Sequence, residues 1–412
     1  MIPNVKTLLS INNYFYRRGG AEVVFLEHNR LFEDAGWRVV PFAMRHENNL
    51  PTEWNTFFPE EIEYGRDYTL IEKAKNAFKI THSFESAEKG AALVDHIAPS
   101  VAHAHNVYHH LSPSIFRVLK NRGVPVVLTL HDLKIACPAI RMLARDGICE
   151  RCKGGAIWNV VSHRCIKNSL ALSTVIFMET AVQRFIGSYS RYVDRFVVPS
   201  RFYIEKFVEW GWDRARFVYI PNFVDVSALQ PAGVPGESFA YVGRLGPEKG
   251  VGTFIRALAQ SGCTGVIVGT GPEEGRLKAL AARLGASVQF LGYRTGEDLF
   301  DTIRAARAIV LPSEWYENAP MSVMEAYALE RPVIGACIGG IPELIREGET
   351  GVTFESGNSE ALAGLLADFN SRPVSELQAM GRTGRQWVER EYSDLRYRDR
   401  ILELYETMGV VQ

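Results

Sequence analysis

The sequence predicts an α/β protein with two domains, each containing a doubly wound parallel β-sheet. Its 412 residues are more than one ordinary hydrophobic core accommodates. From residue 239 onward, short apolar runs alternate with helical patterns, which is typical of a parallel sheet with crossover helices. A strand, a loop, a helix and a second strand over residues 5–43 begin a similar sheet in the first half.

In the first half, residues 12–20 form a loop after the first strand, and Gly36 ends the first predicted helix. The predicted strands there are 5–11, 39–43, 101–105, 124–130, 195–199 and 217–220. The predicted helices are 21–35, 168–188 and 202–210.

The second half follows a Pro- and Gly-rich stretch at 230–237, which is the clearest linker signal in the chain. The strands expected after it are 239–242, 265–268, 288–291, 308–311 and 332–335. The expected helices are 250–260, 273–284, 296–306, 320–329, 342–347, 358–369, 375–390 and 394–407.

The composition indicates a soluble globular protein, with 47% hydrophobic and 23% charged residues. Because 46 basic residues face 47 acidic ones, no overall basic field favours nucleic acid as a partner. No signal peptide is evident, and no apolar run reaches the roughly eighteen residues of a membrane span. We therefore expect a cytoplasmic protein. The aromatic and basic residues of 45–80 leave two alternatives open, a ligand-facing region of the first domain and an amphipathic surface helix, and they also allow peripheral contact with the inner face of a membrane.

Three motifs in the second half carry chemical groups. Glu317 follows the strand 308–311, and Glu325 lies in the next helix, in the pattern E-x7-E. Because a helix turns once in about 3.6 residues, both carboxylates can face one crevice at the carboxyl end of the sheet. The other motifs are Gly-Arg-Leu-Gly-Pro-Glu-Lys-Gly at 243–250 and Gly-Gly-Ile-Pro-Glu at 339–343. In this order the three motifs resemble the donor half of glycosyltransferase family 4, the retaining enzymes of the GT-B fold.

The resemblance implies two Rossmann-like domains that face each other across a cleft. Residues 1–215 would form the acceptor-side domain, 216–390 the nucleotide-sugar domain, and 391–412 a helix that crosses back to the first domain. The implied activity is retaining hexosyl transfer from a nucleotide-diphosphate sugar, with UDP favoured and GDP as the alternative. The implied acceptor is a saccharide or a lipid-linked saccharide in bacterial surface polysaccharide synthesis. In this family the leaving phosphate oxygen is thought to take the acceptor proton, so no enzymic nucleophile is required.

Arg244 and Lys249 lie in the turn at 243–250 and are the candidates for neutralising a diphosphate. Arg offers a fixed fork for phosphate oxygens and Lys a mobile point charge, while the glycines allow close backbone approach. With two cations and a helix N-terminus available, we expect no catalytic metal at the phosphates. The competing interpretation, two isolated surface charges, is weakened by the neighbouring E-x7-E motif.

The resemblance also assigns roles to single residues. It implies that Glu325 binds the ribose hydroxyls and that Glu317 contacts the donor sugar beside the reacting face. The backbone between them would reach sugar and phosphate, although Pro320 has no N–H to donate. The base would lie near Tyr293. The intervening loop residues are Asn318, Ala319, Pro320 and Met321.

In the first domain the resemblance implies a glycine-rich loop, which Gly19 and Gly20 match, and a histidine near the anomeric carbon. His131, just past the strand 124–130, is the candidate for that histidine. The alternatives are His103, His105, His109 and His110.

A cysteine segment follows His131. Cys137, Cys149, Cys152 and Cys165 form the pattern C-x11-C-x2-C-x12-C in a polar, glycine-containing stretch. Four thiolates at such spacing can close a tetrahedral cage, so we expect structural zinc. An iron–sulfur centre, a redox pair or plain thiols remain alternatives, and His163 could replace one cysteine.

Two other functions fit parts of this pattern. A nucleotide-sugar epimerase of the same fold would need no acceptor, but its family lacks the E-x7-E motif. A non-catalytic module could use the zinc loop to bind a partner, but it would not need Arg244, Lys249, Glu317 and Glu325 together.

Overall fold

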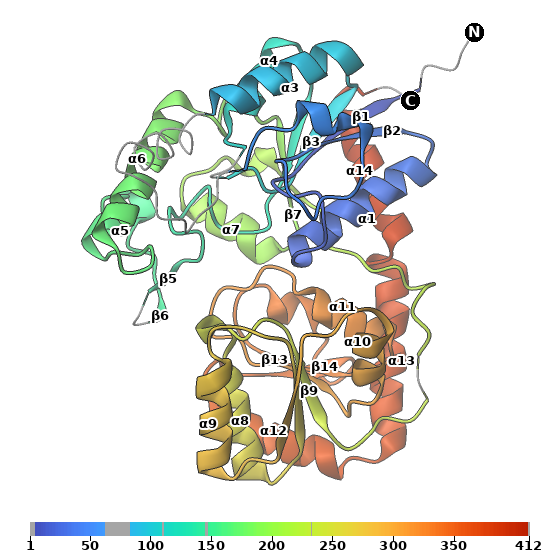
Figure 1. Ribbon diagram of the computed structural model, residues 1–412. Coiled ribbons are helices and arrows are strands. Elements are labelled where there is room, and N and C mark those ends of the chain that lie inside the picture. Colours follow the sequence, from blue (N-terminus) through green and yellow to red (C-terminus); the bar gives the residue numbers. More distant parts are fainter. Residues whose placement is uncertain (1–4, 62–82, 109–110, 145–146, 232, 411–412) are drawn as a thin grey trace.

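The structure, a computed structural model, has two α/β domains, one above the other in Figure 1. It describes residues 5–61, 83–108, 111–144, 147–231 and 233–410. Within these residues each domain holds a six-stranded sheet in which every strand pairing is parallel, so the predicted fold class is confirmed. A two-stranded antiparallel ribbon lies in the cysteine segment.

The first sheet has the order β2-β1-β3-β4-β7-β8, and its strands are apolar runs buried by helices on both faces. Its strands are β1 (Thr7–Ile11), β2 (Arg38–Phe42), β3 (Val101–Ala104), β4 (Val126–Thr129), β7 (Arg195–Val198) and β8 (Phe217–Tyr219). Its helices are α1 (Gly20–Asp34), α3 (Phe84–Ile97), α4 (Ser114–Asn121), α5 (Asn159–Ser162), α6 (Leu170–Ile186) and α7 (Arg201–Glu209). The ribbon strands are β5 (Leu143–Ala144) and β6 (Gly147–Ile148).

The second sheet has the order β11-β10-β9-β12-β13-β14, so the strand order reverses between β9 and β12. Ligands of such sheets bind beyond the carboxyl ends of the strands at this reversal. Its strands are β9 (Phe239–Val242), β10 (Gly265–Val268), β11 (Val288–Gly292), β12 (Ile309–Leu311), β13 (Val333–Ala336) and β14 (Gly351–Phe354). Its helices are α8 (Val251–Ser261), α9 (Glu274–Leu284), α10 (Gly296–Arg304), α11 (Met321–Ala328) and α12 (Ser359–Ser371).

Two C-terminal helices join the domains. α13 (Val374–Glu391) packs on α11 of the second domain, and α14 (Asp394–Thr407) packs on α1 of the first. Tyr397 and Tyr405 of α14 are buried in the core around β1 and α1. The end of the chain therefore stabilises the relative position of the two domains.

The structure corrects three details of the prediction. β8 pairs with β7, so the first sheet extends past residue 215, and the true break is the Pro- and Gly-rich stretch that precedes β9. The predicted helix 342–347 is a short 3-10 turn at Ile341–Leu344, because the backbone is already extended at Ile345 and β14 begins at Gly351. β14 was not predicted, since its four residues contain Gly351 and Thr353 and show no apolar run.

Much of the 45–80 region lies outside the described residues, which end at residue 61 and resume at 83. Residues 53–57 form a 3-10 turn whose Trp54 is buried. In the described part of the chain, every helix is too short or too polar to cross a bilayer.

Candidate functional site

The centre of the site is Glu317, in the loop between β12 and α11. Its side chain is buried, with 6% of the residue exposed. The Lys249 ammonium lies 2.7 Å from Glu317 Oε1, and the Ser313 hydroxyl donates to the same oxygen at 2.6 Å. Burial alone would raise the pKa of Glu317, but Lys249 and Ser313 hold this pKa below its ordinary value. Glu317 is therefore an ionised carboxylate held in a fixed position.

Glu325 lies eight residues after Glu317, in α11, and has a different environment. It is partly exposed, and its carboxylate makes no hydrogen bond or ion pair with any residue that the structure describes. Burial raises its pKa to about 7. An unpartnered, poorly solvated carboxylate gains most from a ligand that donates hydrogen bonds, such as a pair of hydroxyl groups.

The loop at 243–250 carries two cations, and one of them, Lys249, contacts Glu317. Gly250 has φ +63°, and a Cβ there would lie 1.7 Å from the Pro312 carbonyl oxygen, so only glycine allows this contact with the end of β12. The contact places Lys249 next to Glu317. Arg244, on the same loop, is ion-paired with Glu248, whose side chain is completely buried.

Asn318 links this loop to the first domain. Its Nδ2 donates to the Leu130 carbonyl at 3.0 Å, and its Oδ1 accepts from the Ser200 hydroxyl at 2.8 Å. Because Leu130 directly precedes His131, the Glu317 loop lies beside the predicted histidine. Gly20 is also close, since a Cβ at that position would lie 4.0 Å from Met321. The predicted groups of both domains thus approach one another around the N-terminus of α11.

His131 stands at the end of a row of stacked histidine rings, of which His103 and His105 are buried. Its Nε2 is 2.9 Å from His105 Nδ1, and the two rings stack. Burial lowers the pKa of His131 to about 4, so the ring is neutral near pH 7. The alternative His103 bonds Thr129 and Tyr405 and holds α14 to the sheet. His109 and His110 lie outside the described residues.

Other predicted residues occupy positions that limit their roles. Tyr293 is 71% exposed. The Ala319 side chain is buried, and its carbonyl accepts from Asn222 at 2.8 Å. Since the Asn318 amide is occupied by the first domain, only the backbone of this loop remains for a ligand. Pro320 precedes the first turn of α11, whose N–H groups begin at Met321.

Glu343 has a role that sequence reasoning missed. Its carboxylate accepts from the backbone N–H groups of Arg201, at 2.8 Å, and Phe202, at 2.5 Å, and so caps α7 of the other domain. Gly339 and Gly340 allow this approach, because a Cβ on either would lie 2.5 Å or less from backbone atoms of the Glu317 loop. The Gly-Gly-Ile-Pro-Glu motif therefore makes an interdomain contact. In the sequence, the only sign of this contact was a glutamate shortly after two glycines.

The four cysteines of the predicted zinc site line one small cavity, together with Met142 and Trp210. All four are free thiols, and burial and the neighbouring thiols raise the pKa of Cys152 to about 12. In their present positions, no three His, Cys, Asp or Glu side chains of the described residues are arranged to hold a metal ion. The four cysteines lie close together, but their thiols are not arranged as the ligands of a metal ion. Structural zinc at this place stays a prediction.

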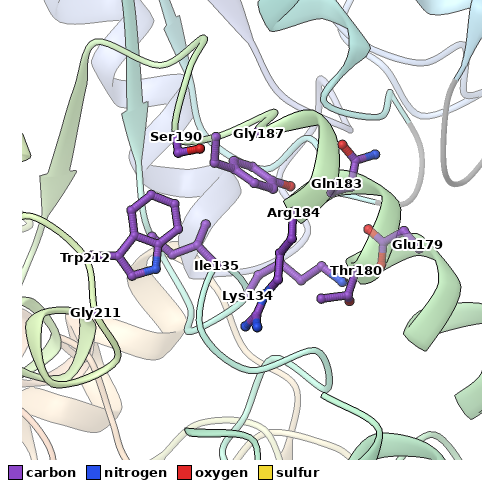
Figure 2. A pocket seen from close by; sticks show the side chains of 11 residues that line it. Lys134, Ile135, Glu179, Thr180, Gln183, Arg184, Gly187, Ser190, Gly211 and Trp212 are labelled. Atoms are coloured by element: carbon purple, nitrogen blue, oxygen red, sulfur yellow. Dashed lines mark hydrogen bonds and ion pairs between the residues drawn. The ribbon is translucent and has the colours of Figure 1, made fainter. Parts of the chain in front are cut away.

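A cavity of about 220 Å³ lies between α6, the loop after β4 and the turn that follows α7 (Figure 2). It contains a buried ion pair, Lys134 with Glu179 at 2.7 Å, and the hydroxyls of Thr180 and Tyr189 have no partner among the described residues. Its lining includes none of the residues predicted for the site, within the part of the chain that the structure describes.

Family models match both halves of the chain. The model described as Glycosyltransferase Family 4 matches residues 18–228, and the model described as Glycosyl transferases group 1 matches residues 233–387. The second match covers the motifs at 243–250, 317–325 and 339–343.

Curated relatives align with parts of the chain. A GDP-mannose-dependent monoacylated alpha-(1-6)-phosphatidylinositol monomannoside mannosyltransferase of Corynebacterium glutamicum is 29% identical over 49% of this chain and 59% of its own length. A putative colanic acid biosynthesis glycosyltransferase of Salmonella typhimurium is 27% identical over 48% of this chain and 50% of its own. A D-inositol 3-phosphate glycosyltransferase of a Mycobacterium species is 38% identical over 38% and 40%. The chain thus spans about half the length of these relatives.

Solved structures match the whole fold. A sucrose-phosphate synthase from Thermosynechococcus elongatus superposes with a TM-score of 0.70, at 19% identity, over 99% of this chain and 100% of that one. An Anabaena protein in complex with UDP and glucose superposes with a TM-score of 0.67, at 17% identity, over 98% and 100%. At these identities the likeness concerns the fold, and the predicted GT-B architecture is confirmed.

Proposed function

The chain belongs to Glycosyltransferase Family 4, and from this membership we propose that it transfers a sugar from a nucleotide-diphosphate donor to a saccharide or lipid-linked saccharide, with retention of configuration. The observation that carries the proposal is the pairing of Lys249 with Glu317 at the strand-order reversal of the second sheet, followed in the next helix by Glu325, whose carboxylate has no partner among the described residues. These groups match the charges and hydroxyls of a nucleotide sugar.

In the proposed complex, Glu325 accepts hydrogen bonds from the ribose hydroxyls, and the buried position of α11 sets how deep the nucleotide lies. Lys249 and Arg244 bind the diphosphate. When a phosphate oxygen takes one N–H of the Lys249 ammonium, Glu317 gains capacity to accept from a hydroxyl of the donor sugar. The 2.7 Å ion pair is thus compatible with diphosphate binding by Lys249 and sugar binding by Glu317. When the ligand binds, each side chain can replace its contact with the other by a contact with the ligand.

We propose that transfer depends on positioning and charge stabilisation. Cleavage of the bond between the anomeric carbon and the phosphate oxygen leaves both electrons on that oxygen, which takes the proton of the attacking hydroxyl. Arg244, Lys249 and the first N–H groups of α11 stabilise the negative charge that builds up there. Protein cations at the diphosphate favour transfer without a divalent metal. The neutral His131 ring offers a hydrogen bond to the sugar from the other side.

The relatives' names suggest the substrate class. They mention a phosphatidylinositol monomannoside, D-inositol 3-phosphate and colanic acid biosynthesis, which fits a saccharide or lipid-linked saccharide acceptor for this chain. GDP-mannose is named for one relative, and UDP is bound in several solved neighbours. We retain UDP as the first candidate and GDP as the second, and a role in bacterial surface polysaccharide synthesis at the cytoplasmic side of the membrane.

The first test is ligand-induced stabilisation with UDP, GDP, UDP-glucose and GDP-mannose. A ligand at a hundred times its Kd stabilises the folded protein by about 2.7 kcal/mol, so one base should raise the thermal midpoint clearly more than the other. Lys249→Ala should lose this response. Lys278→Ala, which removes an exposed ion pair on α9, should keep it.

The competing functions give other outcomes. An epimerase would change the bound nucleotide sugar with no acceptor present, which ¹H NMR of the donor detects. A non-catalytic module would show no stabilisation by any of the four compounds, and that result would remove the proposal. Once an acceptor is found, the anomeric configuration of the product by NMR tests retention.

A further inference from the structure

The cations assigned to the diphosphate are both paired with carboxylates. Lys249 is paired with Glu317, and Arg244 with the buried Glu248. Two positive and two negative side chains cancel, so these four residues alone offer no net charge to a diphosphate. Binding such a ligand in a partly buried site calls for a surplus of positive charge.

Arg141 supplies a further positive charge from the other domain. Its Nη1 lies 3.9 Å from Glu248 Oε2, the oxygen that does not carry the Arg244 contact. Half of the Arg141 side chain is exposed, whereas that of Glu248 is fully buried. The Arg141 guanidinium thus lies at the surface of the loop at 243–250 and is weakly held. Together with the two ion pairs Lys249–Glu317 and Arg244–Glu248, it gives a group of five side chains with a net charge of +1.

The backbone that carries Arg141 is strained on both sides. Ile140 has φ +75° and Met142 has φ +47°, in the left-handed region that side chains other than glycine rarely adopt. Hydrogen bonds hold this turn, from Ile140 N–H to the Cys137 carbonyl at 2.9 Å and from Cys149 N–H to the Met142 carbonyl at 2.8 Å. The Met142 side chain fills the wall of the cysteine cavity. The Met142 side chain is therefore buried in the first domain, while the Arg141 side chain points toward Glu248 of the second domain.

We propose that Arg141 is a phosphate-binding residue for the donor, a third cation that the first domain contributes to the diphosphate site. This inference rests on the proposed function. Glu248 holds Arg244 in place from beneath, and Arg141 exchanges its weak 3.9 Å contact for a charge-assisted hydrogen bond to a phosphate oxygen. Since the charge on the phosphate increases when the sugar leaves, the contact strengthens during transfer and draws the two domains together.

The test compares nucleotide affinity in Arg141→Ala, Arg141→Lys and Arg117→Ala by calorimetric titration. Arg117 is an exposed arginine on α4, away from the site, and serves as the matched control. Arg141→Ala should weaken UDP or GDP, whichever binds, by roughly 10- to 100-fold, the value of one charge-assisted hydrogen bond. Arg141→Lys should restore part of the loss, and the affinity for the corresponding nucleoside should be unchanged in all three.

Each other outcome contradicts the inference in its own way. Unchanged diphosphate affinity in Arg141→Ala, with or without a raised KM for the acceptor, would show that the residue does not bind the donor phosphates. An equal loss for the nucleoside would indicate distortion of the fold rather than a lost phosphate contact. If the wild type and Arg117→Ala bind neither UDP nor GDP, the proposed function fails as well, which distinguishes the two failures.

Discussion

The Lys249 ammonium and the Glu317 carboxylate form an ion pair of 2.7 Å, in which Glu317 is buried and Lys249 only partly so. Each is the other's main electrostatic partner in the residues described. The pair is therefore a structural element, and in the proposed complex it is the part of the site that rearranges when a phosphate binds.

Removing one member of this pair should cost stability. Lys249→Ala leaves a buried carboxylate without its cation, and we expect a loss of about 1–3 kcal/mol at pH 7, measured by urea unfolding. Because folding lowers the pKa of Glu317, its contribution is present at pH values above the ordinary carboxyl pKa of 4.5 and is lost as pH falls below it. The double variant Lys249→Ala/Glu317→Gln should recover much of the loss. A double variant no more stable than Lys249→Ala would refute this interpretation.

Glu325 should make donor binding depend on pH. Its pKa of about 7 means that it is partly protonated at neutral pH, while hydroxyl donors prefer the ionised form. Nucleotide affinity should therefore rise between pH 6 and 8, and Glu325→Gln should flatten this rise. An identical pH profile in the variant would exclude Glu325 from the ribose site.

The same residue should affect stability in the opposite direction. A folded pKa raised from 4.5 to about 7 means that the folded state binds the proton more tightly than the unfolded state. Stability should fall by on the order of 3 kcal/mol as pH rises from 4.5 to 7. Glu325→Gln should remove that slope, as urea unfolding at pH 5 and pH 8 would measure. Equal slopes in both proteins would show that Glu325 is better solvated than its burial implies.

Glu343 should hold the domains together through the N-terminus of α7. Glu343→Ala removes both N–H contacts, and we expect a loss of about 0.5–2 kcal/mol, as for other helix caps. Hydrogen exchange should speed up at Phe202, whose N–H bonds the carboxylate at 2.5 Å. Glu349→Ala, which loses only a 4.0 Å contact with Arg346, is the control. Unchanged exchange at Phe202 would show that the cap contributes nothing in solution.

The spacing of the motifs predicted the strand, loop and helix around Glu317 and Glu325, because these depend on local periodicity. The spacing did not reveal that Glu248 pairs with Arg244, that Glu343 caps a helix of the other domain, or that Arg141 reaches Glu248 in the loop at 243–250. Each of these contacts joins groups whose proximity depends on tertiary packing. The assignment of β8 to the second domain failed for the same reason, since only pairing with β7 shows to which sheet it belongs.

We predict that the four cysteines that line the small cavity bind a zinc ion. Purified, reduced and tag-free protein should contain about one zinc per chain by elemental mass spectrometry, because the four thiols line a single cavity. Cys149→Ser/Cys152→Ser should lose the metal. Cys337→Ser, at an exposed cysteine outside the cavity, should keep it. A content well below one per chain in the wild type would leave plain thiols as the explanation.

We propose that Arg244, Lys249, Glu317 and Glu325 together hold one nucleotide sugar, and a crystal structure of the protein with UDP or GDP would locate that ligand. Phosphate oxygens should lie within hydrogen-bond distance of Lys249 and Arg244, and the ribose hydroxyls should lie within hydrogen-bond distance of Glu325. A nucleotide bound elsewhere, for instance in the Lys134 cavity, with the Lys249 and Glu317 side chains undisturbed, would contradict this proposal.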